Sequence, residues 1–245
     1  MKTMKIAHIV STFPPKTGGM GRVCFEECKR LKQKGVEVEV FTPNFSNIDK
    51  KNYEFKVNYL QGLASKNSAF VPNLFSLPDK FDLIHLHYPF YGGAEWVYLS
   101  SIFKKNKYVT TYHMDADTKG FGRAIQKIYD FIFSKKILKN SKRIITIDKD
   151  HLNNAKFGNN IDKNKIDEIY NGVDLDVFKP IEEPFSQRQN NKTILFVGNL
   201  LPFKRFDLLL RTFSKLNNES KNLKIKVVGG GFEEEKMKRL AKELS

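Results

Sequence analysis

Two glycines lie just ahead of a predicted helix, in a stretch that follows the first predicted strand. The stretch reads Ser11-Thr12-Phe13-Pro14-Pro15-Lys16-Thr17-Gly18-Gly19-Met20-Gly21-Arg22. Glycine lets a ligand approach the backbone closely, and the N–H groups that open a helix favour an anion such as phosphate. The stretch therefore predicts an anion-binding loop, although a simple tight turn uses the same residue types. Its spacing is not G-x-G-x-x-G, so the dinucleotide-binding fingerprint is absent.

His113 follows the predicted strand 108–111, and it therefore lies at the carboxyl edge of the sheet. Doubly wound sheets bind ligands at that edge, which makes His113 a candidate for a ligand site. A structural histidine that caps the strand end is the alternative. Asp115 is close enough in sequence to orient the His113 ring, or equally to cap the next loop.

His85 and His87 are two residues apart at the end of the predicted strand 83–86, so both point to one face. A metal pair is conceivable, but the sequence shows no nearby Cys, Glu or third His that completes a ligand set. We therefore expect no bound metal. Cys24 and Cys28 are four residues apart on one face of a predicted helix, and we interpret them as small hydrophobic residues packed on the sheet.

The composition fits a globular protein: of 245 residues, 40% are hydrophobic and 13% aromatic. This content is too high for a disordered chain, and no run approaches the ~18 apolar residues of a membrane span. The first residues lead into a short apolar run without a small-residue cleavage site, which predicts a strand rather than a signal peptide. Two cysteines cannot form a disulfide framework, so we expect a reducing, cytoplasmic compartment.

The formal net charge of +15 is not spread evenly along the chain. Residues 123–143 hold seven basic side chains against the single acid Asp130, interleaved with isoleucine, leucine and phenylalanine. A core-packing helix with a solvated charged face explains this pattern, and so does a patch that binds an anionic membrane surface. We expect no nucleic acid partner, because no nucleic-acid-binding motif is present.

Short β-rich runs alternate with longer helical ones, which predicts an α/β fold with a parallel sheet. We predict strands at 5–10, 36–41, 83–86, 108–111, 143–147 and 165–169, and helices near 20–34, 93–104, 122–140 and 149–157. Residues 42–80 are interpreted as long loops with at most one edge strand. We predict a first domain over 1–175, a linker over 176–192 and a second, incomplete domain over 193–245 with strands 193–197 and 223–228 and helices 205–216 and 232–244.

Motifs in a fixed order extend this pattern over nearly the whole chain. The first part contains Gly35 before the second strand, Asp82-Leu83-Ile84-His85-Leu86-His87, Thr111-Tyr112-His113-Met114-Asp115, and Asn171-Gly172-Val173-Asp174 followed by Phe178 and Pro180. The second part contains Phe196-Val197-Gly198-Asn199-Leu200, then Pro202 and Lys204, then Val227-Val228-Gly229-Gly230-Gly231. Together these motifs resemble glycosyltransferase family 4.

The resemblance implies a GT-B architecture, in which two Rossmann-like domains flank a cleft. It also implies transfer of a sugar from a nucleotide-diphosphate sugar to an acceptor, with retention of configuration and without a bound metal. The diphosphate would then be met by backbone N–H groups at Gly18 and Gly19 and by Lys204. His113 would lie beside the donor sugar, with His87 and Asp115 as candidates for the acceptor cleft.

Two positions depart from the family's pattern. The family usually has Arg at the place of Asn199, so one diphosphate-binding charge is missing. It often has Gly at the place of Arg205, whose charge we expect to compensate. The family's later Glu-x7-Glu motif, which grips the donor, has no counterpart here, and we therefore expect a C-terminally truncated chain.

The resemblance implies a hexosyltransferase-type enzyme that acts on a glycan or lipid-linked acceptor, in envelope or surface polysaccharide or glycolipid synthesis. It would lie in the cytoplasm, with a possible peripheral position on the inner face of the membrane. The alternative is a catalytically incomplete half-enzyme that acts as a binding subunit. A nicotinamide-dependent oxidoreductase is disfavoured by the missing fingerprint.

Overall fold

The computed structural model describes residues 3–16, 18–45, 51–65, 68–116, 121–180, 192–219 and 223–244. The chain divides into two compact units, Met1–Gly172 and Val173–Ser245, and each is described by itself. Most of the predicted linker 176–192 lies outside the described residues, which do not include 181–191.

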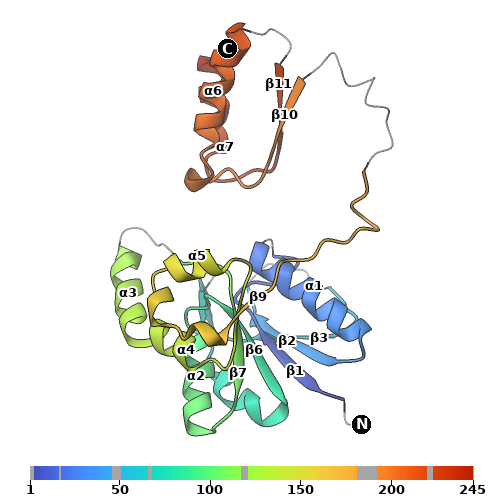
Figure 1. Cartoon of the computed structure of the whole chain (residues 1–245), viewed down its shortest axis with the longest axis vertical. Coiled ribbons are helices and arrows are strands. Elements are labelled where there is room, and N and C mark those ends of the chain that lie inside the picture. The colour runs from blue at the N-terminus through green and yellow to red at the C-terminus, as the bar shows by residue number, and fades with distance from the viewer. Residues whose placement is uncertain are drawn as a thin grey trace. The chain divides into compact units, whose positions relative to one another are not determined.

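Unit 1 is built on a parallel sheet of seven strands among its described residues (Figure 1). The strands are β1 (Lys5–Ile9), β2 (Glu37–Pro43), β3 (Lys56–Leu60), β6 (Leu83–Tyr88), β7 (Tyr108–Tyr112), β8 (Ile144–Thr146) and β9 (Ile166–Glu168). Their order is β3-β2-β1-β6-β7-β8-β9. Successive strands are added on one side of β1 up to β3 and on its other side from β6 onward, so the strand order reverses between β1 and β6. The six predicted strands are confirmed, and β3 is the expected edge strand.

The region 42–80 contains more structure than the loops expected there. After β3 come the antiparallel hairpin of β4 (Leu63–Ser65) and β5 (Ser68–Phe70), and the 3₁₀-helix η1 (Pro72–Lys80). Leu74 is completely buried in the core that includes α2 (Ala94–Phe103). The 3₁₀-helix was missed because its prolines interrupt the α-helical period, although a 3₁₀ segment tolerates them. The two strands were missed because three residues alternate too briefly to be recognised.

Helices pack on the sheet of unit 1, and two separate apolar clusters lie between the helices and the strands. Helix α1 (Gly19–Gln33) packs Cys24 and Cys28 against Ile6, Val38 and Val40, and both thiols are free and completely buried. This confirms that the two cysteines are small core residues. The other cluster joins Ala7, Ile9, Ile84 and Leu86 to α2 and to α4 (Lys135–Asn140).

The predicted helix 122–140 is continuous but not uniform. It consists of α3 (Phe121–Tyr129), the π-helical turn η2 (Asp130–Ser134) and α4. Helix α5 (Lys149–Asn154) follows β8 and begins at Asp148, whose carboxylate accepts hydrogen bonds from the backbone N–H groups of Asp150 and His151. Such a cap stabilises a helix by about 1 kcal/mol. The 3₁₀ turns η3 (Gly158–Asn160) and η4 (Lys163–Lys165) then lead to β9.

Unit 2 has two parallel strands among its described residues, β10 (Lys192–Val197) and β11 (Leu223–Val228). The turn η6 (Pro202–Lys204), α6 (Phe206–Glu219) and α7 (Glu234–Glu243) complete the two predicted β-α repeats. Phe206, Leu210 and Met237 form the centre of its small core. Leu195 and Val197 of β10 are exposed, so part of this sheet carries apolar side chains that the described residues do not cover.

A helix that crosses a membrane must be long and apolar. None of the described helices of either unit is long and apolar enough to cross a bilayer.

Candidate active site

The loop that enters α1 has the geometry expected for an anion-binding loop. Gly18 is the N-cap residue in an extended conformation, no side chain caps the helix, and its first turn holds no acid. The first N–H groups of such a helix have no intrahelical partner. A Cβ on Gly19 would meet nothing within 4 Å, whereas one on Gly21 would lie 2.4 Å from the carbonyl oxygen of Thr12. Gly21 therefore serves packing, and Gly19 lies open beside the helix N-terminus.

Four histidines from β1, β6 and the residue after β7 lie together, and we call His8, His85, His87 and His113 the histidine cluster. His8 of β1 pairs in register with His85 of β6, and His87 with Thr111 of β7. Side chains along β1 and β6 alternate between the two faces of the sheet. Ile6 and Leu83 lie on the same face as the histidines of their strands, and both pack in the apolar core under α1. The cluster histidines thus occupy the α1 face of the sheet, nearer its carboxyl edge.

Hydrogen bonds link the rings of the histidine cluster into a chain. His8 Nδ1 and His87 Nε2 are 3.2 Å apart, and His87 Nδ1 and His113 Nε2 are 3.1 Å apart. His85 Nε2 lies 2.7 Å from Thr111 Oγ1. The backbone N–H of His113 also donates to the carbonyl of Tyr88, which ties the residue to the end of β6.

Burial keeps these imidazoles uncharged. It lowers the pKa of His85 and of His113 to about 4, and it holds the pKa values of His8 and His87 well below the ordinary range. Glu27 of α1 reaches the same place, and burial raises the pKa of its carboxyl group to about 7. At neutral pH the histidine cluster therefore supplies hydrogen-bonding groups rather than positive charge.

Two expectations about these histidines need correction. A third histidine, His8, and a glutamate, Glu27, do lie beside His85 and His87, so a set of potential metal ligands exists. In addition, His87 is completely buried and contacts His113, so it does not itself line an open surface of unit 1. Sequence reasoning missed both facts because β1, α1, β6 and the end of β7 are distant in sequence and become neighbours only in the fold. A histidine in each of two predicted core strands was the available signal.

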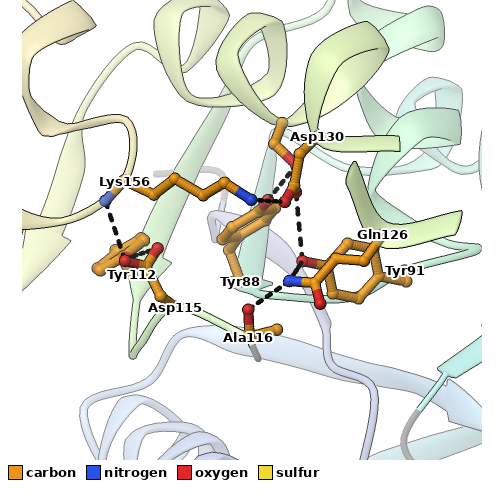
Figure 2. A network of polar contacts seen from close by, with 9 residues as sticks. Tyr88, Tyr91, Tyr112, Asp115, Ala116, Gln126, Asp130 and Lys156 are labelled. Carbon is orange, nitrogen blue, oxygen red and sulfur yellow. Dashed lines mark hydrogen bonds and ion pairs between the residues drawn. The ribbon is translucent and has the colours of Figure 1, made fainter. Parts of the chain in front are cut away.

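A second polar network lies on the other face of the sheet and includes Asp115 and Ala116 of the loop after β7 (Figure 2). Its centre is Asp130 of η2, which is 3% exposed and pairs with the ammonium group of Lys156. Asp130 also accepts hydrogen bonds from Ser134 Oγ at 2.7 Å and from the Tyr91 hydroxyl at 3.4 Å. Tyr88, at the end of β6, donates to Ser134 at 2.7 Å. The network thereby fastens the π-helical turn to the carboxyl edge of the sheet.

Asp115 belongs to this second network and not to the histidine cluster. Its carboxylate accepts a hydrogen bond from the Tyr112 hydroxyl at 2.5 Å and from the backbone N–H of Lys156 at 2.9 Å (Figure 2). Of the two roles left open by the sequence, the structure shows the one in which Asp115 fastens a loop. Gln126 donates to the carbonyl of Ala116, next to Asp115.

The predicted phosphate-binding residues of unit 2 lie together in the loop after β10. Asn199 precedes the turn η6, Lys204 is the last residue of that turn, and Lys204 Nζ lies 5.4 Å over the ring of Phe203. Arg205 adopts a left-handed conformation with φ 51° and ψ 39°. Its guanidinium pairs with Asp207 at 3.2 Å, so part of its charge is already balanced.

The left-handed conformation of Arg205 is relevant because the family often has glycine at this position. Glycine adopts this region at no steric cost, whereas other residues do so rarely. The geometry therefore explains why glycine suits this position, and it shows that arginine occupies it at an energetic cost.

Comparison with solved structures defines the class of fold. The Anabaena protein Alr3699/HepE, solved in complex with UDP-glucose, matches 98% of this chain with a TM-score of 0.69 at 14% identity, over 66% of its own length. WaaG, a glycosyltransferase involved in lipopolysaccharide biosynthesis, matches 98% of the chain with a TM-score of 0.60 at 15% identity, over 67% of its length. The chain thus has the GT-B fold of glycosyltransferases, as predicted.

Family models identify the particular family. The model of glycosyltransferase family 4 matches residues 17–177, and that of glycosyl transferases group 1 matches residues 177–245. The chain belongs to glycosyltransferase family 4, as the motifs predicted.

Curated relatives agree with this family. The D-inositol 3-phosphate glycosyltransferase of Mycobacteroides abscessus is 25% identical over 249 residues, which cover 87% of this chain and 53% of the relative. That of Mycolicibacterium smegmatis is 26% identical over 81% of this chain and 52% of the relative. The chain spans about half the length of the curated relatives that it matches.

Proposed function

We propose that this chain takes part in the transfer of a sugar from a nucleotide-diphosphate sugar to an acceptor, with retention of anomeric configuration. The observation that carries the proposal is the uncapped N-terminus of α1 at the point where the sheet order reverses, together with the neutral imidazole of His113 at the carboxyl end of β7. Structural relatives that hold UDP or UDP-glucose support a nucleotide sugar as the donor.

The chemistry of the leaving group assigns roles to the loops of each unit. A diphosphate gains negative charge as the sugar leaves, and without a metal that charge must be met by N–H groups and basic side chains. In unit 1 the backbone at Gly18 and Gly19 would provide such groups. In unit 2 the exposed Lys204 and Arg205 would provide positive charge, with the Asn199 amide beside them. The transfer step itself would need no metal.

His113 would contact the donor sugar as a neutral ring. Its Nε2 atom is engaged by His87 Nδ1, so Nδ1 is the ring nitrogen that can meet a ligand. Because burial lowers its pKa, His113 would be a neutral ring at neutral pH, without the second proton of an imidazolium, and would donate a hydrogen bond from its single N–H group. His87 acts here as a positioning residue behind His113.

The acceptor proposed for this protein is a glycan or a lipid-linked molecule, in envelope or surface glycan synthesis. Ile125, Ile128 and Phe131 are exposed on α3 and η2, with Phe131 88% exposed. Exposed basic residues flank them, namely Arg123, Lys127, Lys135, Lys136 and Lys139. Apolar side chains surrounded by positive charge suit the anionic inner face of a membrane. Free cysteines are consistent with a cytoplasmic position at that face.

Calorimetric titration with UDP-, GDP- and ADP-sugars, and with NAD as a control, tests the proposal. We expect at least one nucleotide sugar to bind and NAD not to bind. A radiolabelled transfer assay and the anomeric NMR signal of the product then test turnover and retention. Binding of NAD alone would refute the proposal, and binding without turnover would identify a binding subunit.

A further inference from the structure

The interior of unit 1 holds a group of potential metal ligands, of which the proposed sugar transfer uses only His87, as a positioning residue. One ligand atom each from His8, Glu27, His85 and His87 lie within 4.8 Å of one another. His8 Nδ1 is 3.2 Å from His87 Nε2, and Glu27 Oε2 is 3.7 Å from His87 Nε2 and 4.0 Å from His85 Nδ1. A tetrahedral zinc ion with bonds near 2.0–2.1 Å requires about 3.3 Å between its ligand atoms. Small side-chain rotations would therefore bring the group to that geometry.

The outer nitrogen atoms of two of these histidines already have partners. His85 Nε2 lies 2.7 Å from Thr111 Oγ1, and His87 Nδ1 lies 3.1 Å from His113 Nε2. Metal-binding histidines usually donate their second N–H to such a partner, which fixes the tautomer and directs the other nitrogen's lone pair at the ion. The contacts of His85 and His87 fit this arrangement.

The same place contains buried polar atoms that lack a hydrogen-bond partner. Among the described residues, Glu27 Oε2 and His8 Nε2 are both in this state. A buried acceptor without a partner costs about 1–3 kcal/mol. A cation next to the Glu27 carboxylate would remove that cost, because the oxygen faces His85 and His87 rather than solvent.

We propose that His8, His85, His87 and Glu27 bind one divalent transition-metal ion of the zinc class. Three imidazoles and one carboxylate suit zinc, whereas magnesium and calcium take oxygen ligands. The ligands come from β1, β6 and α1, so the ion would join the helix to the sheet. His87, held with its proton on Nδ1, would then donate to His113 Nε2.

A competing group shares one of these ligands. His8, Cys24 and Cys28 also have ligand atoms within 4.8 Å of one another. This set offers three ligands instead of four, and both thiols are completely buried. We therefore favour the set that contains Glu27.

Zinc binding by the purified full chain tests the proposal without reference to enzymatic activity. After treatment with a chelator, the protein is titrated with Zn²⁺ against a chromophoric competitor, and with Co²⁺ as a spectroscopic probe. We expect one Zn²⁺ per chain, the visible absorption of four-coordinate cobalt, and a rise in melting temperature with added zinc. Removal of a supporting partner by Thr111→Val should weaken the affinity about 10–100-fold.

Glu27→Gln tests the carboxylate ligand and should weaken zinc binding by more than Thr111→Val does. Glu26→Gln, on the same helix, removes a carboxylate that pairs with Arg22, and it should leave zinc binding unchanged. Absence of stoichiometric zinc in the wild type would overturn the proposal, as would equal affinity in the Glu27 and Glu26 variants. Loss of zinc in a Cys24→Ser/Cys28→Ser variant, with binding kept in Glu27→Gln, would assign the ion to the thiols instead.

Discussion

His113 and Lys204, two side chains with direct roles in the proposed reaction, lie in opposite environments. His113 is largely buried against His87, and its pKa is lowered to about 4 by that burial. Lys204 is exposed and rests on the ring of Phe203. A neutral imidazole suits contact with sugar hydroxyls, and an exposed ammonium group suits contact with a diphosphate. The difference in burial therefore makes His113 suitable for contact with the sugar and Lys204 suitable for contact with the diphosphate.

Gly19→Val should weaken nucleotide-sugar binding about tenfold or more while the fold is kept. A Cβ at this position meets nothing within 4 Å, so folding tolerates it, but a branched side chain beside the helix N-terminus blocks close approach of a phosphate. Calorimetric titration with the nucleotide sugar that binds best measures the effect. Gly172→Val is the matched control, because its Cβ also meets nothing within 4 Å. Equal affinity in the two variants would count against the loop assignment.

Arg205→Gly should stabilise unit 2 and weaken nucleotide binding at the same time. Glycine removes the cost of the left-handed conformation at φ 51°, which is about 1 kcal/mol for other residues. Arg205→Ala removes the same charge but keeps the strain, so it serves as the control. Urea unfolding should rank the glycine variant as the more stable of the two, and equal stability would show that the conformation is not strained.

The continuous helix of α3, η2 and α4 has an unusual distribution of side chains over its first half. Gln126, Asp130 and Ser134, spaced by four residues, are buried, whereas Ile125 and Phe131 are exposed. Polar residues can face inward here because the tyrosines of β6 and the following loop, together with Lys156, satisfy them (Figure 2). The apolar residues of this half are thereby left on the surface.

Asp130→Asn should destabilise unit 1 by about 2–3 kcal/mol, since a buried hydrogen-bonded charge is lost. The asparagine has nearly the same shape, but it cannot accept equally strong bonds from Ser134 and Lys156. Asp79→Asn is the control, because it breaks the more exposed pair with Lys104, which we expect to contribute at most about 1 kcal/mol. Thermal unfolding measures both, and an equal loss in the two variants would contradict a structural role for the network.

Binding of the protein to anionic vesicles should fall steeply with added salt. The field of the exposed lysines is screened within about 8 Å at physiological ionic strength. Flotation with vesicles of phosphatidylcholine alone, or with phosphatidylglycerol added, measures the dependence. Phe131→Ser should reduce binding to anionic vesicles, because this side chain is 88% exposed and would insert into the interface. Equal binding to neutral and anionic vesicles would remove the membrane patch and leave a solvated helix.

At the scale of the whole molecule, the two units differ in how well their sheets are covered. Every residue of β6 except Leu83 is buried, whereas Leu195, Val197 and Val228 of the unit 2 strands are exposed. A pocket of about 680 Å³ also lies between α6, α7 and β11, beside Phe206, Leu210 and Met237. A small core with exposed apolar strands contributes less to stability than a covered one.

Hydrogen exchange should therefore be faster in β10 and β11 than in β1, β6 and β7. We expect a difference of at least about tenfold, which corresponds to about 1.4 kcal/mol. The edge strand β3 is the internal control, because it belongs to the well-covered unit yet is only half-buried. Equal protection in both units would show that the exposed apolar side chains of unit 2 are covered in solution. If this protection increases with protein concentration, a second copy of the chain covers them.

The sequence by itself determined the fold class and most of the elements, although not β4, β5 and η1. The six predicted strands, the helices between them and the glycine loop before α1 follow from local periodicity and turn residues, which act over a few positions. The family motifs could be recognised in the sequence because each of them also spans only a few positions. Asp148 at the start of α5 caps its helix through contacts two and three residues away.

Only the tertiary structure decided which of these residues meet. His8 and His87 are 79 positions apart, and they share a hydrogen bond because the sheet order places β1 beside β6. Asp130 faces inward because tyrosines from another strand and Lys156 satisfy it, which reverses the polarity that helical periodicity predicts. Local patterns carry no information on such partners, since parallel strand order and buried polar contacts arise from chain segments that are distant in sequence.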